Sequence, residues 1–342
     1  MRSALRGALI GFGGVAERGH WPGYRGDPRF EICAIVDPDP AARERATRAV
    51  GERLRPYPSL AACLGSESLD FVDIATPPCE HLPAIERAAA ARLHLLVEKP
   101  LALTLEDALR AERAARDVGV ALLVVHNWHH APHFRAALEA LQKGAIGAAQ
   151  EVEFVTERTE PAGGGAGSWR VDPKIAGGGI LVDHGWHQLY LARALLGGRE
   201  PRSVQASIER RRFGVSSVED TALVRVRYQG GARARLWLTW AAPRRRTLVE
   251  VRGESGVLRV EHGEVVVAAR GEPERPWPVE RDAPDDSYHA SWFPGVLDAF
   301  FEAVREPASA AGNQREALLC RAVIDAAYRS AGRGGSEVAV EI

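Results

Sequence analysis

The stretch Gly11-Phe12-Gly13-Gly14-Val15-Ala16 has the form G-x-G-x-x-A and follows a short apolar run that begins at Gly7. We predict a strand for that run and a helix after the glycines, which is the context that a dinucleotide fingerprint requires. In this context Gly11 permits the tight turn, Gly13 lets the backbone approach a pyrophosphate, and Ala16 allows the helix to pack closely on the strand. The N-terminus of the helix then faces the phosphates.

A carboxylate follows the second predicted strand, Glu31 to Val36. Asp37 lies about 20 residues beyond the fingerprint, where a carboxylate accepts both hydroxyls of a ribose. The same charge repels a 2′-phosphate, and the neighbours Pro38 and Asp39 offer no Arg or Lys to bind one. We therefore expect NAD as the cofactor rather than NADP. For the fingerprint taken alone, a glycine turn without a ligand is the alternative.

From the fingerprint to about Val125, short apolar runs alternate with charged, alanine-rich segments. This pattern is typical of parallel strands joined by crossover helices and predicts a doubly wound α/β domain. Thr104 is the expected N-cap of one helix, and Pro22 should shorten or kink the first helix. The further strands are expected at residues 71–75, 94–97 and 121–125, and the helices at residues 41–50, 81–92 and 104–118.

The pattern changes after Gln150, where β-rich runs at residues 151–157 and 204–267 are separated by glycine turns. They predict a mostly antiparallel sheet. Two helices, 291–305 and 314–330, and a strand, 337–342, should follow. We expect a Rossmann domain of residues 1–126 and an α+β domain of residues 127–342, with the C-terminal helices as candidates to pack back on the first domain. Residues 162–179 hold seven glycines and form a candidate mobile loop.

Composition excludes several classes of protein. With 46% hydrophobic and 26% charged residues in a chain of 342, the sequence is typical of a folded protein. Its 44 basic and 45 acidic residues give no electrostatic footprint for nucleic acid or an acidic membrane surface. No stretch approaches the roughly 20 apolar residues of a membrane span. The four cysteines, without Cys-x-x-Cys spacing, fit a reducing cytoplasm.

Two further motifs carry candidate chemistry. Glu98-Lys99-Pro100 follows the strand at 94–97, so Lys99 should lie at the strand's carboxyl end, where open α/β sheets bind ligands. A solvated ion pair in a loop is the alternative. Asp183 and His187 are four residues apart at the start of a helix predicted over 186–196, a spacing that puts both on one face. Here the alternative is an N-cap aspartate and a locally satisfied histidine.

Taken in order, these motifs carry a resemblance. The fingerprint, Asp37, Ala75-Thr76-Pro77-Pro78 with His81, Glu98-Lys99-Pro100 and the Gly-Gly-x-x-x-Asp-x-x-x-His of residues 178–187 closely resemble the Gfo/Idh/MocA family. These are the relatives of glucose-fructose oxidoreductase and inositol dehydrogenase. The resemblance spans almost the whole chain. It implies a Rossmann domain, followed by an open-faced sheet that often forms the interface of a homodimer or homotetramer.

The resemblance also implies roles for individual residues. The cofactor would be lined by Thr76, Pro77, His81, Glu98 and Lys99, together with the whole fingerprint, Gly11, Phe12, Gly13, Gly14, Val15 and Ala16, and with Asp37. Lys99, Asp183 and His187 fall on the family's catalytic positions, with His187 as the base. Asn127, Trp169 and Arg170, with Asp183 and His187, would touch a sugar-like or cyclitol-like substrate.

Some features stay open. Four histidines, at positions 126, 129, 130 and 133, invite a zinc site, but Pro132 interrupts the segment and no cysteine lies nearby. We therefore expect no metal there, and a polar wall of the pocket that faces the substrate is the favoured interpretation. The basic runs 210–212 and 244–246 indicate a solvated strand face first, and subunit or anionic-substrate contacts second. We expect an NAD-dependent dehydrogenase acting on a secondary alcohol. An NAD-dependent glycoside hydrolase and a non-catalytic nucleotide-binding regulator are the alternatives.

Overall fold

The structure is a computed structural model that describes residues 4–51, 53–161, 168–212, 218–281 and 288–342. The chain divides into two compact units. The first contains residues 1–127 and 283–317, and the second contains residues 128–282 and 318–342. Part of the candidate mobile loop, residues 162–167, lies outside the described residues.

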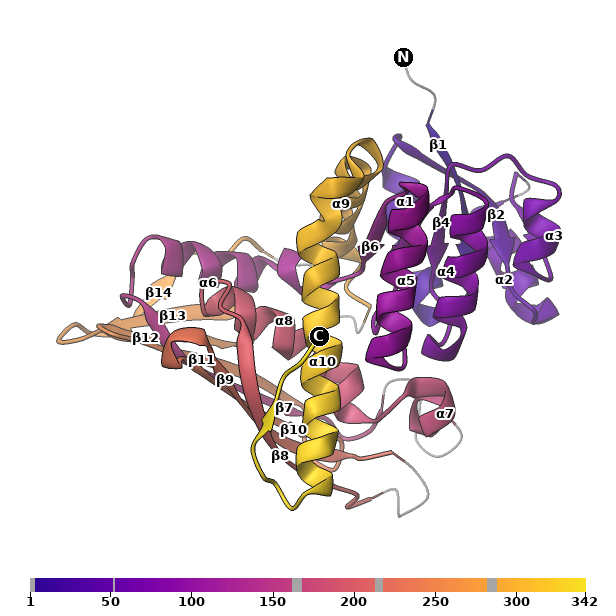
Figure 1. Ribbon diagram of the computed structural model, residues 1–342. Helices are drawn as coiled ribbons and strands as arrows, with labels where there is room; N and C mark the ends of the chain where they lie inside the picture. The colour runs from indigo at the N-terminus through magenta and orange to yellow at the C-terminus, as the bar shows by residue number, and fades with distance from the viewer. Residues whose placement is uncertain (1–3, 52, 162–167, 213–217, 282–287) are drawn as a thin grey trace. The chain divides into compact units, whose positions relative to one another are not determined.

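The first unit is built on a parallel sheet (Figure 1). Its strands, as far as the chain is described, follow the order β3-β2-β1-β4-β5-β6, which reverses at β1. That reversal places the carboxyl ends of β1 and β4 at a topological switch point, where α/β sheets bind ligands. The strands are β1 (Leu5–Ile10), β2 (Phe30–Val36), β3 (Arg55–Tyr57), β4 (Phe71–Ile74), β5 (His94–Val97) and β6 (Leu122–Val124).

Helices of the first unit bury their alanine-rich and aromatic faces against this sheet. Thr104 caps α5 as predicted, because its side chain accepts the amide proton of Asp107. Phe293 and Phe300 join the aromatic core around Phe71 although they lie more than 200 residues away along the chain. The helices are α1 (Trp21–Gly26), α2 (Pro40–Val50), α3 (Leu60–Leu64), α4 (His81–Ala90), α5 (Leu105–Val118), α9 (Phe293–Arg305) and the first residues of α10 (Ala311–Gly332).

The first helical segment does not end at Pro22. A π-helical turn, Ala16–His20, precedes α1, and the amide of Trp21 donates to the carbonyl of Ala16. The helix then continues to Gly26 with Pro22 in its first turn, where a missing amide proton is tolerated. The wide turn therefore accommodates the proline by a change of helix type.

The second unit contains a nine-stranded sheet among its described residues, in the order β14-β13-β12-β11-β7-β10-β9-β8-β15. The prediction of a mostly antiparallel sheet is confirmed, although β7 and β10 pair in parallel. The strands are β7 (Ala149–Glu157), β8 (Pro201–Glu209), β9 (Thr221–Tyr228), β10 (Arg233–Thr239), β11 (Arg246–Gly253), β12 (Gly256–Glu261), β13 (Glu264–Ala269), β14 (Arg275–Trp277) and β15 (Val338–Ala339).

One face of this sheet is buried and the other is not. Alternate residues such as Phe154, Val224 and Leu236 are buried, and helices α6 and α8 pack on the sheet. The helices of this unit are α6 (Pro132–Gln142), α7 (Pro173–Ala176), α8 (Trp186–Leu195) and the remainder of α10. Within the described part of the chain, no helix is long and apolar enough to cross a membrane.

Candidate functional site

The glycine turn of the fingerprint has the geometry that its sequence predicts. Gly11 has a φ of 86°, and a Cβ there would lie 3.0 Å from the carbonyl oxygen of Ala75, so a side chain would be strained and crowded. A Cβ on Gly13 would meet no described atom within 4 Å. Ala16 is fully buried against the sheet. The turn therefore leaves open space at the one position where a pyrophosphate must approach the backbone.

The carboxylate of Asp37 lies beside the glycine turn and stabilises it through hydrogen bonds to main-chain amides. Its Oδ2 accepts the amide proton of Phe12 at 2.8 Å, and its Oδ1 accepts that of Asp39 at 2.9 Å. Helix α2 also brings Arg43 back to this point, where its Nη1 donates to the carbonyl oxygens of Asp37 and Pro38. Sequence inspection of the immediate neighbours missed this guanidinium, because it lies six residues from Asp37 along the chain.

Thr76 and His81 follow β4 at the same end of the sheet. The buried Oγ1 of Thr76 has no hydrogen-bond partner among the described residues. His81 is fully buried, with its ring nitrogens 2.8 Å from the carbonyl oxygen of Pro100 and 2.9 Å from that of Thr76. Burial lowers the pKa of His81, with the carbonyl contacts opposing the shift. His81 thus ties the Thr76 turn to the segment after β5, and Pro77 lies between them, half-buried.

Glu98 and Lys99 lie at the carboxyl end of β5, as predicted, and the Lys99–Pro100 peptide bond is cis. The Oε2 of Glu98 accepts the amide proton of Lys99 at 3.0 Å. Its Oε1 lies 3.0 Å from Nε2 of His20, a buried residue that sequence reasoning did not select. Burial by itself would raise the pKa of Glu98, but the hydrogen bond and charge of His20 outweigh it and hold that pKa below its usual value.

In the second unit, Asp183 lies in a π-helical turn, Leu181–Gly185, that leads into α8. This turn is held at its start by Glu219, whose Oε1 accepts the amide protons of Gly179 and Leu181 at 2.9 and 3.1 Å and the hydroxyl proton of Tyr328 at 3.0 Å. Burial raises the pKa of Glu219, although these donors oppose the shift. Sequence reasoning did not select Glu219 either.

The glycines before Asp183 are explained by the same contacts. A Cβ on Gly178 would lie 2.0 Å from the Tyr328 hydroxyl, and one on Gly179 would lie 1.8 Å from the carbonyl oxygen of Glu219. Neither position can carry a side chain while Glu219 and Tyr328 keep their places. The Gly-Gly part of the motif is therefore required by packing, in addition to any flexibility.

His187 is buried on the first turn of α8, where Tyr190 and Trp128 contact its ring. Its Nδ1 lies 2.8 Å from the hydroxyl of Tyr190, which also accepts the amide proton of Trp128 at 3.1 Å. The Trp128 indole stacks on the imidazole at a centroid distance of 4.7 Å and an angle of 9°. The hydroxyl of Tyr190 and the stacked indole of Trp128 together fix the orientation of the imidazole. Asp183 Oδ2 lies 3.3 Å from Nδ1 of His184.

The remaining candidates fall in both units. The buried Oδ1 of Asn127, in the first unit, has no hydrogen-bond partner among the described residues. In the second unit, Trp169 and Arg170 share a short 3-10 turn, with the guanidinium 4.3 Å from the indole centroid. Of the four clustered histidines, His126 is buried, and its Nδ1 lies 3.1 Å from Oε2 of Glu316 in the first unit.

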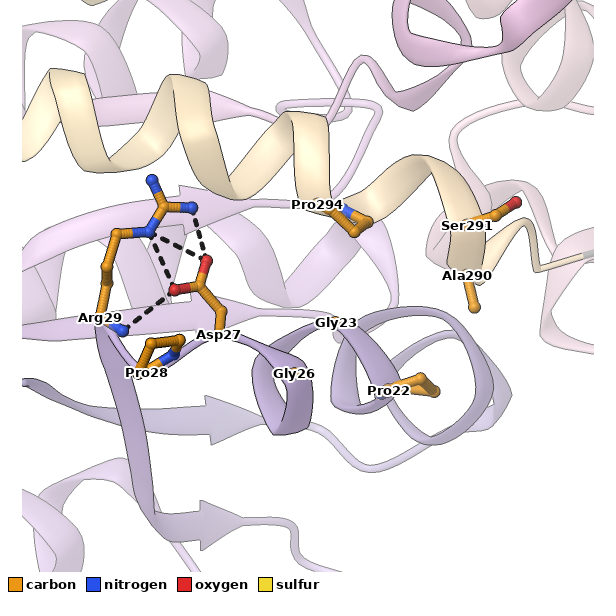
Figure 2. A pocket seen from close by; sticks show the side chains of 9 residues that line it. All are labelled: Pro22, Gly23, Gly26, Asp27, Pro28, Arg29, Ala290, Ser291 and Pro294. Atoms are coloured by element: carbon orange, nitrogen blue, oxygen red, sulfur yellow. Dashed lines mark hydrogen bonds and ion pairs between the residues drawn. The ribbon is translucent and has the colours of Figure 1, made fainter. Parts of the chain in front are cut away.

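A surface hollow of the first unit lies apart from these residues. It is lined by the end of α1, the Asp27 to Arg29 loop and the start of α9, and Figure 2 shows the Asp27–Arg29 ion pair within it. The side-chain hydrogen bond from Arg29 lowers the pKa of Asp27. None of the predicted cofactor or catalytic residues lines this hollow, so it is not the candidate active site.

Comparisons with known proteins agree with this geometry. Residues 5–143 match the oxidoreductase family with an NAD-binding Rossmann fold, and residues 134–259 match the GFO/IDH/MocA C-terminal domain. A D-apiose dehydrogenase of Paraburkholderia graminis is 34% identical over 75% of this chain and 67% of its own length. An inositol 2-dehydrogenase of Rhizobium meliloti is 28% identical over 95% of this chain and 96% of its own.

Among solved structures, GenD2 from gentamicin A biosynthesis, in complex with NAD, superposes with a TM-score of 0.83 at 28% identity. The superposition covers 100% of this chain and 98% of GenD2. The open space over Gly13 and the orphaned hydroxyl of Thr76 fit an NAD-binding site at this end of the sheet. These findings confirm the Rossmann fold and the resemblance. The chain belongs to the GFO/IDH/MocA family of NAD-binding oxidoreductases.

Proposed function

We propose that this protein oxidises a secondary alcohol of a sugar, cyclitol or related polyol with NAD, or reduces the corresponding ketone. The observation that carries the proposal is the Glu98-Lys99-Pro100 turn, which follows β5 at the same sheet end as the fingerprint and is anchored there from both sides. An ammonium beside a nicotinamide site suits the stabilisation of negative charge on an oxygen. The names of the apiose and inositol relatives support the substrate class.

NAD rather than NADP is the proposed cofactor. Asp37 keeps a carboxylate where the adenosine ribose of a dinucleotide binds, and the Arg43 guanidinium beside it already donates to two main-chain carbonyls. The fingerprint, Asp37, Thr76, Pro77, His81, Glu98 and Lys99 are the residues proposed to hold the cofactor. When bound, the nicotinamide supplies a hydride acceptor.

We assign Lys99, Asp183 and His187 as the catalytic residues. His187 takes the hydroxyl proton as the general base, with its ring oriented by Tyr190. Lys99 stabilises the negative charge that develops on the substrate oxygen, and Asp183 orients the substrate or His187. Asn127, Trp169 and Arg170 are proposed substrate contacts. A polyol suits this set, because amide, carboxylate and guanidinium groups together donate to and accept from hydroxyls.

The first test is a screen in which enzyme and NAD are mixed with cyclitols, aldoses, amino sugars and sugar acids while NADH is followed. A dehydrogenase accumulates NADH with one of these classes. Substrate cleavage without net NADH would indicate the hydrolase chemistry, to which the dehydrogenase relatives give no support. Binding of NAD without any turnover would indicate a regulator.

His187→Asn is expected to lower turnover by roughly 10²-fold or more, because the imidazole base is removed. The affinity for NAD should stay near that of the wild type. The matched control is His262→Asn, since His262 is exposed in the turn between β12 and β13 and its φ of 53° is one that asparagine tolerates. Unchanged turnover in His187→Asn would remove His187 from the mechanism.

The exposed face of the second unit's sheet is the proposed subunit interface. Leu223, Trp237, Val155 and Leu248 are direct cross-strand neighbours on β9, β10, β7 and β11 and form one half-exposed apolar row. Beside it runs a charged row formed by Arg225, Arg235, Glu153, Glu250 and Arg259. An apolar row flanked by both charges suits a self-complementary contact, as in a homodimer or homotetramer.

Light scattering on the wild type and on Trp237→Lys tests this assignment. A dimer or tetramer that becomes monomeric in the variant is expected, whereas an unchanged assembly would move the interface elsewhere. We also propose residues 1–126, with the C-terminal segment that joins the first unit, as the cofactor domain, and the rest of residues 127–342 as the substrate and oligomerisation domain. We propose a cytoplasmic location, which is supported by four cysteines that the structure keeps as thiols rather than as disulfides.

A further inference from the structure

His20 is a buried histidine that the proposed chemistry does not use. It is the last residue of the π-helical turn that follows the fingerprint, and it is 2% exposed. Its ring stacks on Phe293 of α9, with centroids 4.2 Å apart and planes 15° apart. A wholly buried imidazole needs partners for both ring nitrogens, and those partners decide its charge.

Both partners of the ring are carboxylates. Nδ1 lies 2.9 Å from Oδ2 of Asp73 on β4, and Nε2 lies 3.0 Å from Oε1 of Glu98 at the end of β5. An ionised carboxylate can only accept hydrogen bonds, so between two ionised carboxylates both ring nitrogens would donate and the ring would be an imidazolium. Tyr24 of α1 donates its hydroxyl proton to the same Oδ2 of Asp73 at 3.0 Å.

The charges around this ring favour the same assignment. Burial would lower the pKa of His20, but the charge and hydrogen bond of Asp73, followed by those of Glu98, raise it to about 10. Glu98 also feels the charge of Lys99, which favours its ionised form. Two carboxylates with an imidazolium and an ammonium give a balanced group of four charges. Without the imidazolium, burial would drive one carboxyl to take up a proton.

The side chain of Glu98 links His20 to the main chain of Lys99. Glu98 uses Oε1 to accept from His20 and Oε2 to accept the amide proton of Lys99. Beyond Lys99, the carbonyl oxygen of Pro100 lies 2.8 Å from Nδ1 of His81. The turn that carries the lysine is therefore fixed by a buried histidine on either side, and on the His20 side the link is ionic.

We propose that His20 is a positioning residue for the dehydrogenase: as an imidazolium between Asp73 and Glu98, it keeps Glu98 ionised and oriented, and Glu98 in turn sets the main chain at Lys99. The proposal rests on the proposed role of Lys99 in polyol oxidation. It accounts for a histidine that lies in the cofactor unit without belonging to the fingerprint. His20 itself need not touch substrate or cofactor.

The protonation state is tested on the resting wild-type protein, apart from activity. Nitrogen-15 NMR of histidine-labelled protein, with His20→Gln used to assign the signal, should show both ring nitrogens of His20 protonated from pH 6 to pH 9. Loss of either proton within this pH range would overturn the proposal. This measurement requires no substrate. It is made on the wild type, and the variant is needed only to assign the signal.

The positioning role is tested by the pH profile of kcat/KM for the polyol that the screen identifies. His20→Gln should lower kcat/KM at least tenfold and add a new ionisation, below which activity falls, because Glu98 now takes up a proton. Tyr24→Phe is the matched control, since it removes the other hydrogen bond to Asp73 and leaves both ring contacts of His20 in place. It should keep the wild-type profile.

Adding Glu98→Gln to His20→Gln should abolish the new ionisation, because no carboxyl is left to titrate. A wild-type rate and profile in His20→Gln would overturn the positioning role while the proposed function stands. The same new ionisation in Tyr24→Phe would also overturn it, since any disturbance of the cluster would then suffice. Absence of polyol turnover in the wild type would instead contradict the proposed function, and the positioning role with it.

Discussion

Two glutamates, the partly buried Glu98 in the first unit and the buried Glu219 in the second, each hold a segment that carries proposed catalytic residues. Glu98 is held by an imidazolium and binds the Lys99 amide, whereas Glu219 receives two amide protons and a phenol proton from Gly179, Leu181 and Tyr328. Burial acts on both carboxyls in the same direction. Their pKa values nevertheless shift in opposite directions, downwards for Glu98 and upwards for Glu219.

The difference shows how the partner decides the state of a buried acid. A charged partner offsets desolvation through charge attraction as well as hydrogen bonding, whereas neutral donors offset it through hydrogen bonds alone. Glu98 therefore depends on its negative charge, and Glu219 depends mainly on the position of one oxygen atom. The two glutamates should therefore respond differently to a change of pH, to the removal of their charge and to the removal of their hydrogen-bond donors.

The largest expected effect is that of pH on the stability contributed by His20, the partner of Glu98. The pKa of His20 in the folded state, about 10, lies above its ordinary value of 6.5. Its contribution to the free energy of unfolding is therefore complete below pH 6.5 and is lost as the pH rises through about 10, an effect of several kcal/mol.

Chemical denaturation at several pH values measures this loss. In His20→Gln the alkaline loss should be much smaller than in the wild type. Glu98, whose pKa is lowered, adds to the free energy of unfolding at pH values above the ordinary pKa of glutamate. This contribution is lost as the pH falls through the folded-state pKa of Glu98. Glu219, whose pKa is raised, acts in the opposite sense and loses stability as the pH rises through its folded pKa. A loss of stability at alkaline pH that is equally large in the wild type and in His20→Gln would contradict the imidazolium assignment.

A smaller effect is expected when charge alone is removed from each glutamate. Glu98→Gln should lower the free energy of unfolding by about 3 kcal/mol, because it leaves a buried imidazolium with one carboxylate fewer. Glu219→Gln should lower it by less than about 1 kcal/mol, since the amide oxygen can still accept the same three protons. Urea denaturation at pH 7 compares the pair. Equal losses would show that charge does not distinguish the two sites.

Effects no larger than that of a single hydrogen bond should come from the phenols that donate to the two carboxylate clusters. Tyr24→Phe and Tyr328→Phe each remove one hydroxyl from a buried carboxylate, at Asp73 and Glu219. Each should destabilise the protein by about 1 kcal/mol, the net value of one hydrogen bond. In kinetics, Tyr328→Phe should lower kcat more than Tyr24→Phe, because only Tyr328 supports the segment that leads to Asp183. A larger effect of Tyr24→Phe on kcat would reverse that ranking.

The sequence was informative where contacts are local or where a strand order repeats a known pattern. It predicted β5 and α8 to within one residue and the Thr104 cap, because these depend on neighbours in the chain. It missed β3 and α3, which are too short to show a period. The parallel pairing of β7 with β10 was also missed, since it joins strands that are far apart in sequence.

The candidate site shows the same division. The fingerprint, Asp37 and Lys99 follow predicted strands directly, so their placement at one end of the sheet could be predicted. His20 and Glu219 could not be found in this way. The contacts of His20 reach 53 and 78 residues along the chain, and those of Glu219 reach 40 and 109 residues. Only a folded chain brings such partners together, and neither residue forms a recognisable motif with its neighbours.

The most direct test of the central claim is isotope transfer from a polyol deuterated at the carbon that bears the reacting hydroxyl. With wild-type enzyme and NAD, we expect each turnover to place one deuterium on the nicotinamide of NADH, and turnover to be slower than with the protiated polyol where hydride transfer limits the rate. Product that forms while NADH carries no deuterium would contradict direct hydride transfer and, with it, the assignment of this protein as a polyol dehydrogenase.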